Sequence, residues 1–592
     1  MHNDPRNLRY PRKCLLARQP PSAACFLNDM GANNLPMKDQ AKSCLQPYPT
    51  SDAVSIWHSC SWRRLGMACI LTFSLSFAAC SDRASEAAQY AQLSQAQLQA
   101  GKLDEARENV RAAIRTRDDV AEYFVLLGRV ELRSGKLPSA FNAYSRALDL
   151  QADNLEILQA IAELGLQTGR ITEAEEAADR MLLLFPGSPR ALLVKGFLAI
   201  EVGDFNEAER FANALLAQNA NDEGGTILAA RLKALNGDFD SAAATVLQSI
   251  EANGETDALN TTLLEVYRAQ GHAEGMREVF QTLLASIGAA SDYQIDFVNF
   301  LYKTGDTSTA RNEVMKAMDA QPDDAARLAS LSELFFEYDL SPLDPSQLSE
   351  IARSGTRTTR LALARFYLES GQLEEAKSIL AQPVERRVLE AQALMARIAL
   401  AEGRTQEADR YIDITLDRDP RNPDALIARS ARRLGSDKID DAIEDANIVV
   451  SYTPQEYAGY AALANAYAAK QSDLRARRVF ELGMDLVPQS QRLAERYKNF
   501  LASIDDRARI VSLYGDLATA KPSSIEAWQQ FSKMCDEFGD RVCQAKVERG
   551  LARAFKSYAI DKPPGTPRAR GLFARITPEQ ICRSSGGICT GV

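Results

Sequence analysis

Glycines recur along this chain at one fixed interval. Seven of them, the first at residue 101, are separated by six equal steps of 34 residues. An alanine follows five positions after six of the seven, and Met276 stands at that position in the remaining unit. A register held this long predicts repeated structural units rather than a set of unrelated domains. The glycines are Gly101, Gly135, Gly169, Gly203, Gly237, Gly271 and Gly305.

The period breaks once and then resumes. The break falls in the stretch FFEYDLSPLDPSQLSE at residues 335–350, and the glycine register returns at Gly371 and Gly403. Four prolines then close successive units at intervals of 34 residues. Proline cannot continue a helix, because it lacks the backbone N–H and clashes with the preceding turn, so each marks the end of a unit. These prolines are Pro420, Pro454, Pro488 and Pro522.

Each unit is predicted to be a pair of amphipathic helices. In the unit over 121–154, two runs of apolar and small residues recur three or four positions apart, as one face of a helix requires. Between the runs lies Gly135, which without a side chain can adopt the left-handed backbone that ends the first helix. Small side chains at Gly128 and Ala140 let the two helices approach closely. The first run is Phe124, Leu127, Gly128 and Glu131, and the second is Ala140, Tyr144 and Ala147.

This pattern of small, aromatic and proline positions at a period of 34 resembles the tetratricopeptide repeat family, from about Ala87 to about Lys556. The resemblance implies an all-α, right-handed α-solenoid of about fourteen helix–turn–helix hairpins, divided into two blocks if the break near 335–350 separates them. Stacking buries faces that one hairpin cannot bury alone, and it leaves a concave inner surface. The expected hairpins begin at residues 87, 121, 155, 189, 223, 257, 291, 325, 357, 389, 423, 457, 491 and 525.

The N-terminal region carries a targeting signal. Arg63 and Arg64 precede an apolar run over 65–79, which is too short to span a bilayer but suits the core of a signal peptide. The sequence FAAC that ends at Cys80 resembles the lipobox of bacterial lipoproteins, with Phe77 where leucine is usual. By that resemblance Cys80 is acylated and becomes the first mature residue, and several acyl chains give a durable anchor. The alternative is an ordinary cleaved secretory signal with an incidental cysteine.

The chain is therefore expected to divide into seven segments. Residues 1–62 are a disordered leader or an over-extended gene start, 63–79 the signal peptide and 80–86 the lipidated N-terminus. Block 1 of the array covers 87–324, 325–356 is a divergent hairpin or hinge, and block 2 covers 357–556. A proline-rich linker and cysteine-containing tail close the chain at 557–592.

Four further cysteines follow Cys80 in the expected mature chain. They are Cys535, Cys543, Cys582 and Cys589, an even number in a disulfide-permissive compartment. Local pairs are expected, with Cys535 and Cys543 flanking one hairpin turn. A four-cysteine metal site is the alternative, although the spacing within the pairs is wider than the short knuckles that zinc prefers.

The charge of the chain argues against nucleic acid as a partner. Removing residues 1–79, which hold nine Lys/Arg and four Asp/Glu, takes the formal net charge from −10 to −15. Such a surface repels phosphates. The expected partners are other envelope proteins, bound in the concave groove, and the membrane, reached through the lipid anchor; the oligomeric state is left open.

Little in the sequence supports catalysis. After residue 79 the only histidine is His272, beside a turn glycine, and one histidine supplies neither a catalytic triad nor a histidine zinc site. Carboxylates such as Glu374 and Glu375 recur just after the turns, where acids favour the start of a helix. We therefore expect no enzyme activity, no cofactor and no metal.

The groove is expected to be lined by the first helix of each hairpin. Among residues at the ninth position of the hairpins, Arg129, Arg231, Arg365 and Arg397 are the candidate groove contacts. Arg365 and Arg397, one hairpin apart, either grip an acidic chain or an anionic sugar, or form intramolecular salt bridges. The ninth positions considered are Arg129, Glu163, Arg231, Glu265, Asn299, Arg365, Arg397, Asn465, Asn499 and Lys533.

These features favour a lipid-anchored periplasmic scaffold that holds other proteins. The residue after the candidate cysteine is Ser81 and not aspartate, which is compatible with delivery to the outer membrane. The lipobox and the first repeat resemble those of lipoproteins associated with exosortase (PEP-CTERM) systems or exopolysaccharide export. Three alternatives remain: a pilus or outer-membrane assembly lipoprotein, a cytoplasmic adaptor or regulator, and a helical-repeat enzyme, which would need a further domain.

Overall fold

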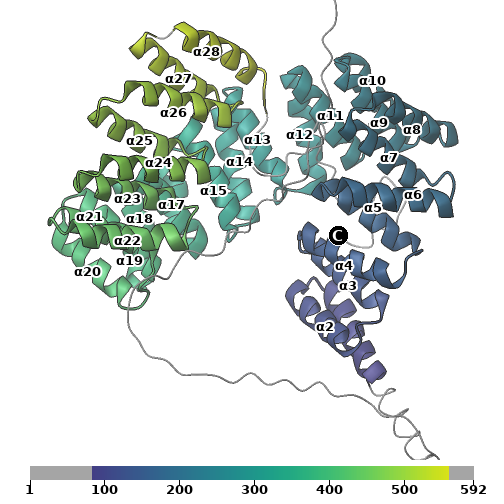
Figure 1. Cartoon of the computed structure of the whole chain (residues 1–592), viewed down its shortest axis with the longest axis horizontal. Coiled ribbons are helices and arrows are strands. Elements are labelled where there is room, and N and C mark those ends of the chain that lie inside the picture. Colours follow the sequence, from purple (N-terminus) through teal and green to yellow (C-terminus); the bar gives the residue numbers. More distant parts are fainter. Residues whose placement is uncertain (1–82, 540, 559–592) are drawn as a thin grey trace, which may run out of the picture. The chain divides into compact units, whose positions relative to one another are not determined.

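The computed structural model describes residues 83–539 and 541–558, and in that part of the chain all regular structure is helical. Figure 1 shows antiparallel helices that follow one another in sequence order. Residues 83–99 are helical. The helices of the first half are α2 (Leu103–Thr116), α3 (Ala121–Arg133), α4 (Leu137–Leu150), α5 (Leu155–Thr168), α6 (Ile171–Leu184), α7 (Pro189–Val202), α8 (Phe205–Gln218), α9 (Glu223–Leu235), α10 (Phe239–Asn253), α11 (Asp257–Gln270), α12 (Ala273–Ile287), α13 (Asp292–Lys303) and α14 (Thr307–Ala320).

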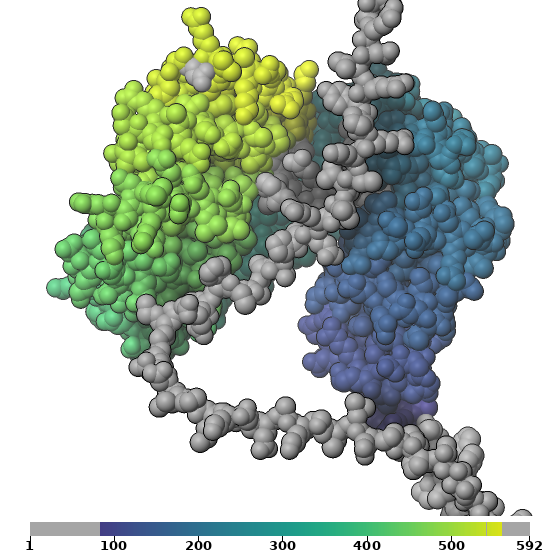
Figure 2. Space-filling model, in the orientation of Figure 1, coloured from purple at the N-terminus to yellow at the C-terminus, as the bar shows by residue number. Residues whose placement is uncertain are grey.

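The second half continues the same order. In the space-filling view the colours grade from green to yellow over these helices, because each hairpin lies beside the next (Figure 2). The helices are α15 (Ala325–Tyr338), α16 (Pro345–Ser354), α17 (Arg357–Glu369), α18 (Leu373–Glu385), α19 (Leu389–Ala401), α20 (Thr405–Leu416), α21 (Pro423–Leu434), α22 (Ile439–Tyr452), α23 (Tyr457–Ala469), α24 (Asp473–Leu486), α25 (Gln491–Ser503), α26 (Arg507–Ala520), α27 (Ile525–Phe538) and α28 (Arg541–Ala554).

The predicted array of hairpins is confirmed. From α3 onward, the first helix of each hairpin begins within one residue of the position expected from the register. The turn glycines from Gly101 to Gly305 all have positive φ, between 71° and 83°, which is the left-handed backbone that glycine adopts most easily. The four closing prolines lie between helices, as at Pro488 between α24 and α25.

Small residues set the distance between the helices of a hairpin. A Cβ added at Gly128 of α3 would lie 2.5 Å from Cε2 of Tyr144 on α4. In the next unit, three positions further along the first helix, a Cβ on Gly165 would lie 2.7 Å from Cβ of Ala174. The second helix therefore packs directly on the backbone of the first, and the sequence pattern has a steric cause.

The divergent hairpin over 325–356 is built differently from the others. Its helix α16 packs against α18 and, more lightly, against α17. The place of the turn glycine is taken by Asp339, which is buried and accepts two hydrogen bonds from Arg311, at 2.7 and 2.9 Å. One apolar core cluster nevertheless runs from Leu192 to Ile398 and includes Leu331, so the core is continuous through this hairpin.

Several predicted segments lie outside the described residues. They are the leader over 1–62, the signal peptide over 63–79, Cys80, and all but the first two residues of the tail over 557–592. The boundaries assigned to these segments stay predictions. Among the helices of residues 83–539 and 541–558, none is both long and apolar enough to cross a bilayer.

The packing predicts that Gly128 tolerates no large side chain. We expect Gly128→Leu to lower the free energy of unfolding by about 2–4 kcal/mol, because the new side chain displaces the Tyr144 ring. The urea midpoint measured by far-UV circular dichroism checks this. Gly135→Ala is the matched control: no atom lies within 4 Å of its added Cβ, so only the left-handed backbone penalty of about 1 kcal/mol applies. Equal effects of the two changes would contradict the steric account.

Candidate functional site

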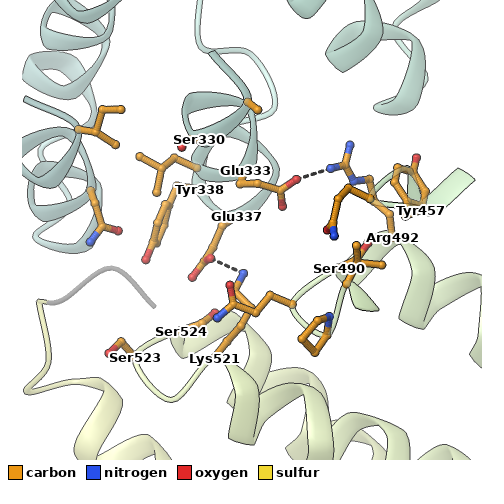
Figure 3. Close-up of a pocket in the computed structure, with 18 of the residues that line it drawn as sticks. Ser330, Glu333, Glu337, Tyr338, Tyr457, Ser490, Arg492, Lys521, Ser523 and Ser524 are labelled. Carbon is orange, nitrogen blue, oxygen red and sulfur yellow. Dashed lines mark hydrogen bonds and ion pairs between the residues drawn. The ribbon is translucent and has the colours of Figure 1, made fainter. Parts of the chain in front are cut away.

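A cleft of about 560 Å³ has two walls. One is made by the first helices of two consecutive hairpins, and the other by the N-terminal ends of the first helices of three later hairpins. We call this cleft the inner cleft. One wall is formed by α13 and α15, and the other by residues at or before the starts of α23, α25 and α27 (Figure 3). The repeat positions of Asn299 and Glu333 place both on this inner wall, one hairpin apart. Residues that line the cleft include Asp292, Ile295, Asp296, Asn299, Lys303, Ser330, Glu333, Leu334, Glu337, Tyr338, Tyr457, Val487, Arg492, Lys521 and Ser523.

Asn299 has an unsatisfied donor beside this cleft. Its side chain is only 3% exposed, and its Nδ2 has no hydrogen-bond partner among the described residues. A buried amide without an acceptor is unfavourable by roughly 1–3 kcal/mol. A carbonyl oxygen of a bound molecule would satisfy it.

Two ion pairs cross the inner cleft. Arg492 of α25 pairs with Glu333 of α15, and Nζ of Lys521 lies 2.8 Å from Oε2 of Glu337 (Figure 3). Lys521 and Glu337 are both almost buried, with side chains 11% and 8% exposed. Burial would raise the pKa of Glu337, but the Lys521 ammonium outweighs it and the pKa is lowered. These pairs join hairpins that are 159 and 184 residues apart in the sequence.

The Arg492 guanidinium is held on several sides. Besides Glu333 it pairs with Glu369 of α17, whose side chain is 3% exposed. Its guanidinium carbon lies 4.1 Å from the centroid of the Phe336 ring and 4.7 Å from that of Tyr457, both within cation–π range. Arginine suits this place because its planar guanidinium can donate several hydrogen bonds to carboxylates and can also stack on aromatic rings.

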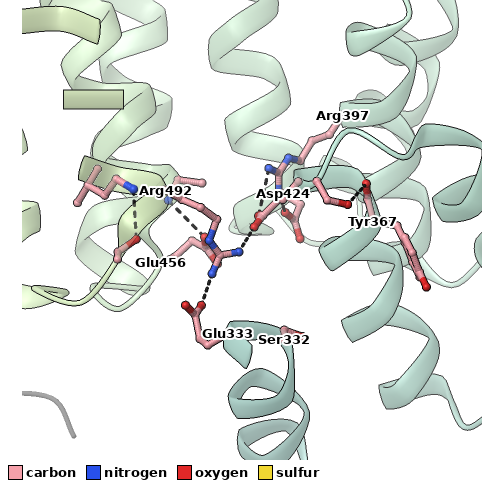
Figure 4. Close-up of polar contacts among 12 residues, drawn as sticks. Ser332, Glu333, Tyr367, Arg397, Asp424, Glu456 and Arg492 are labelled. Carbon is pink, nitrogen blue, oxygen red and sulfur yellow. Dashed lines mark hydrogen bonds and ion pairs between the residues drawn. The ribbon is translucent and has the colours of Figure 1, made fainter. Parts of the chain in front are cut away.

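From Arg492 a series of ion pairs continues along the inner helices. Arg397 lies 3.6 Å from Oε1 of Glu369 and 2.6 Å from Oδ1 of Asp424, and Arg365 lies 2.5 Å from the other oxygen of Asp424 (Figure 4). Burial would raise the pKa of Asp424, but the two arginines lower it to about 2. We call Glu333, Arg492, Glu369, Arg397, Asp424 and Arg365 the inner ion-pair chain; it alternates in sign, with three carboxylates and three guanidinium groups.

The sequence matches the tetratricopeptide repeat over residues 92–154 and again over 131–196. The chain contains tetratricopeptide repeats. The matched region holds α2 to α6 and the first part of α7, and the same hairpin register continues in the structure to α28. No curated protein matches the chain.

Solved structures resemble this tetratricopeptide-repeat protein at low identity. A tetratricopeptide repeat protein from Parabacteroides merdae is 19% identical, with a TM-score of 0.34, over 43% of this chain and 99% of its own. PilW, a type IV pilus biogenesis factor, is 18% identical with a TM-score of 0.29, over 35% and 96%. PilF of Pseudomonas aeruginosa is 17% identical with a TM-score of 0.27, over 35% and 94%. All three TM-scores are below 0.5, and no functional argument follows from them.

The structure brings two of the four predicted groove arginines together. Arg365 and Arg397 share Asp424, so the second alternative, an intramolecular salt bridge, describes their contacts. Arg129 is half-exposed and pairs with Glu156. Arg231 is buried, with its guanidinium carbon 4.6 Å from the Phe197 ring centroid, and burial lowers its pKa to about 9. Contact of any of them with a ligand stays a prediction.

Two of the predicted cysteines, and His272, make structural contacts in the described part of the chain. Cys535 of α27 and Cys543 of α28 form a disulfide across the hairpin turn, with their Cα atoms 5.6 Å apart. Cys80, Cys582 and Cys589 lie outside the described residues. His272 accepts a hydrogen bond from the backbone N–H of Gly275 and so caps α12. Residues 83–539 and 541–558 contain no cluster of three or more potential metal ligands.

Sequence reasoning missed Glu333, Glu369, Asp424 and Arg492. Glu333 also stands at the ninth position of its hairpin, but it was not among the residues considered. Asp424 and Arg492 stand at the second position of their hairpins, and no pattern in one repeat shows which distant helix they face. A charged residue at the start of an inner helix is the signal that a search could have used.

The inner ion-pair chain predicts a strong effect of removing Arg492. We expect Arg492→Met to lower the free energy of unfolding by about 3 kcal/mol, because Glu369 loses a cation in a buried place. The double variant with Glu369→Gln should regain most of this loss. Urea unfolding of the single and double variants measures both effects.

The matched control is Arg507→Met, which removes an exposed ion pair with Asp505. Its effect should stay below about 1 kcal/mol. A loss in Arg492→Met no larger than this control would contradict the assigned contacts.

The buried carboxyl group of Glu163 should make the free energy of unfolding depend on pH. Burial raises its pKa to about 7, against the opposing effects of Arg190 and Gln159. Because the unfolded carboxyl titrates near 4.5, this group makes the folded state less stable as pH rises from about 4.5 through 7. Glu163→Gln should therefore match the wild type at pH 5 and exceed its free energy of unfolding by about 1–3 kcal/mol at pH 8. Urea unfolding at both pH values checks this, and a difference independent of pH would refute it.

Proposed function

We propose that this tetratricopeptide-repeat protein is a non-catalytic scaffold whose inner cleft binds an extended segment of a partner protein. Proteins built from these repeats bind protein partners. The observation that carries the assignment to this cleft is the buried Nδ2 of Asn299, which lacks an acceptor. A backbone carbonyl of an extended segment supplies one, and the exposed Leu486 and half-buried Val487 offer apolar surface to its side chains.

We further propose that the scaffold is anchored in the bacterial envelope through acylated Cys80 and faces the periplasm. The support is in the sequence: two arginines, an apolar run of signal-peptide length, and the small residues before Cys80. A scaffold for envelope assembly, or for exopolysaccharide or protein export, fits that location.

Site-specific photo-cross-linking tests the binding site. A photoreactive amino acid in place of Ser330, which is exposed and lines the inner cleft, should cross-link a discrete partner in intact cells. The same amino acid at Ser349, exposed on α16 away from the cleft, is the control and should give none. Cross-linking from both positions alike, or from neither, would contradict binding in the inner cleft.

Metabolic labelling with a clickable palmitate tests the anchor. We expect the label in the wild-type chain and in the membrane fraction, and its loss in Cys80→Ser. Equal labelling of the Cys80→Ser variant, or no label in the wild type, would remove the proposed anchor while leaving the binding site untouched.

A further inference from the structure

The last described residues lie at the rim of the inner cleft. Lys303 and Ser523 both line the cleft. Nζ of Lys303 donates to the carbonyl oxygens of Ser523 and Ser557, at 2.5 and 2.7 Å. The hydroxyl groups of Ser523 and Ser557 lie 2.7 Å apart. The Tyr558 ring packs on Phe300 of α13, with centroids 5.4 Å apart. The chain is thus fixed to the cleft wall immediately before residue 559.

The sequence that follows has a distinctive composition. Residues 568–576 read RARGLFARI, with three arginines and no acidic residue. Leu572 and Phe573 stand in the middle of this basic segment. It therefore combines an apolar centre with positive charge on both sides.

The inner cleft offers the complementary chemistry. Four carboxylates line it, against three basic side chains. Glu333 pairs with Arg492 and Glu337 with Lys521, and Oδ2 of Asp296 lies 3.6 Å from the Arg268 guanidinium. Asp292 is exposed at the start of α13 and makes no ion pair within the described part of the chain. Apolar side chains line the cleft together with the charged ones, and Nδ2 of Asn299 has no hydrogen-bond acceptor among the described residues. An apolar pair flanked by arginines is complementary to this wall, because the arginines are opposite in charge to its carboxylates and the pair can contact its apolar side chains.

The basic segment is close enough to reach the cleft. Nine residues, 559–567, separate it from Tyr558. Extended chain covers about 3.3 Å per residue, so these residues span roughly 30 Å. Pro563, Pro564 and Pro567 favour an extended backbone, which lowers the entropy lost on docking.

We propose that the inner cleft binds residues 568–576 of the same chain, which thereby compete with the partner segment. The inference rests on the proposed function, because it assigns a regulator to the same site. Leu572 and Phe573 fill the apolar part beside Leu486 and Val487, and the arginines face Asp292 and Glu333. A tethered segment acts at an effective concentration of about 1 mM, so even weak docking occupies the cleft.

A labelled peptide tests this competition. The probe is a fluorescein-labelled synthetic peptide of residues 566–578, and fluorescence anisotropy measures its binding to the full chain. In a full-chain variant with Arg568→Glu, Arg570→Glu and Arg575→Glu, the tethered segment no longer competes. We expect the peptide to bind this variant about 10-fold more tightly than it binds the wild type. This factor follows if the effective concentration of the tethered segment in the wild type is about ten times its dissociation constant for the cleft.

Two further variants locate the binding. Ser330→Arg, added to the variant with three glutamates, places a large cation in the cleft and should abolish peptide binding. Ser349→Arg, on the exposed face of α16, should leave it unchanged. Equal affinity of the wild type and the variant with three glutamates, or retention of binding with Ser330→Arg, would overturn the proposal.

The outcome separates this inference from the proposed function. A partner cross-linked from position 330, together with no peptide binding, means that the cleft serves a partner and the tail does not regulate it. Peptide binding blocked by Ser330→Arg, with no partner cross-linked, means that the cleft holds the tail and the proposed partner site fails.

Discussion

The close approach of two helices at small side chains is the contact on which this structure depends. Gly128 meets the ring of Tyr144, and Gly165 meets Ala174, at separations that leave no space for a Cβ. A hairpin packed this tightly still leaves apolar faces exposed, and those faces are buried only by the hairpins before and after it. Stability is therefore shared along the array, and the inner helices are held at regular spacing without a central domain.

Repetition of one hairpin geometry also explains how distant residues meet. Each hairpin is slightly rotated from the last, so helices far apart in sequence come to face each other along the inner wall. Arg492 of α25 reaches Glu369 of α17 and Glu333 of α15, and Lys521 reaches Glu337. Glu369, Lys521 and Glu337 are buried or nearly so, and at such places a lost partner has a large effect, whereas Glu333 is half-exposed. Two of these pairs, Arg492 with Glu333 and Lys521 with Glu337, join residues from opposite walls of the inner cleft.

The sequence predicted the repeats well and the site poorly, for a physical reason. Hairpin starts and turns are local properties: a glycine with positive φ, such as Gly135, and a proline that ends a helix are each visible in a few residues. The ion-pair partners depend on the rotation between hairpins summed over several units. Arg365 and Arg397 were correctly recognised as neighbours one hairpin apart, but Asp424, which joins them, comes from the next hairpin and follows no repeated pattern. The unpartnered amide of Asn299 likewise depends on side chains from other units.

We conclude that ion pairs through Arg492 hold the hairpin of α15 and α16 against that of α25 and α26. A distance measurement between these hairpins tests it most directly, with spin labels attached through unnatural amino acids at Ser349 and Ser512, both exposed. Double electron–electron resonance should give one narrow distance distribution in the wild type, and Arg492→Met should broaden it. A broad distribution in the wild type, or a narrow one that Arg492→Met leaves unchanged, would contradict the account.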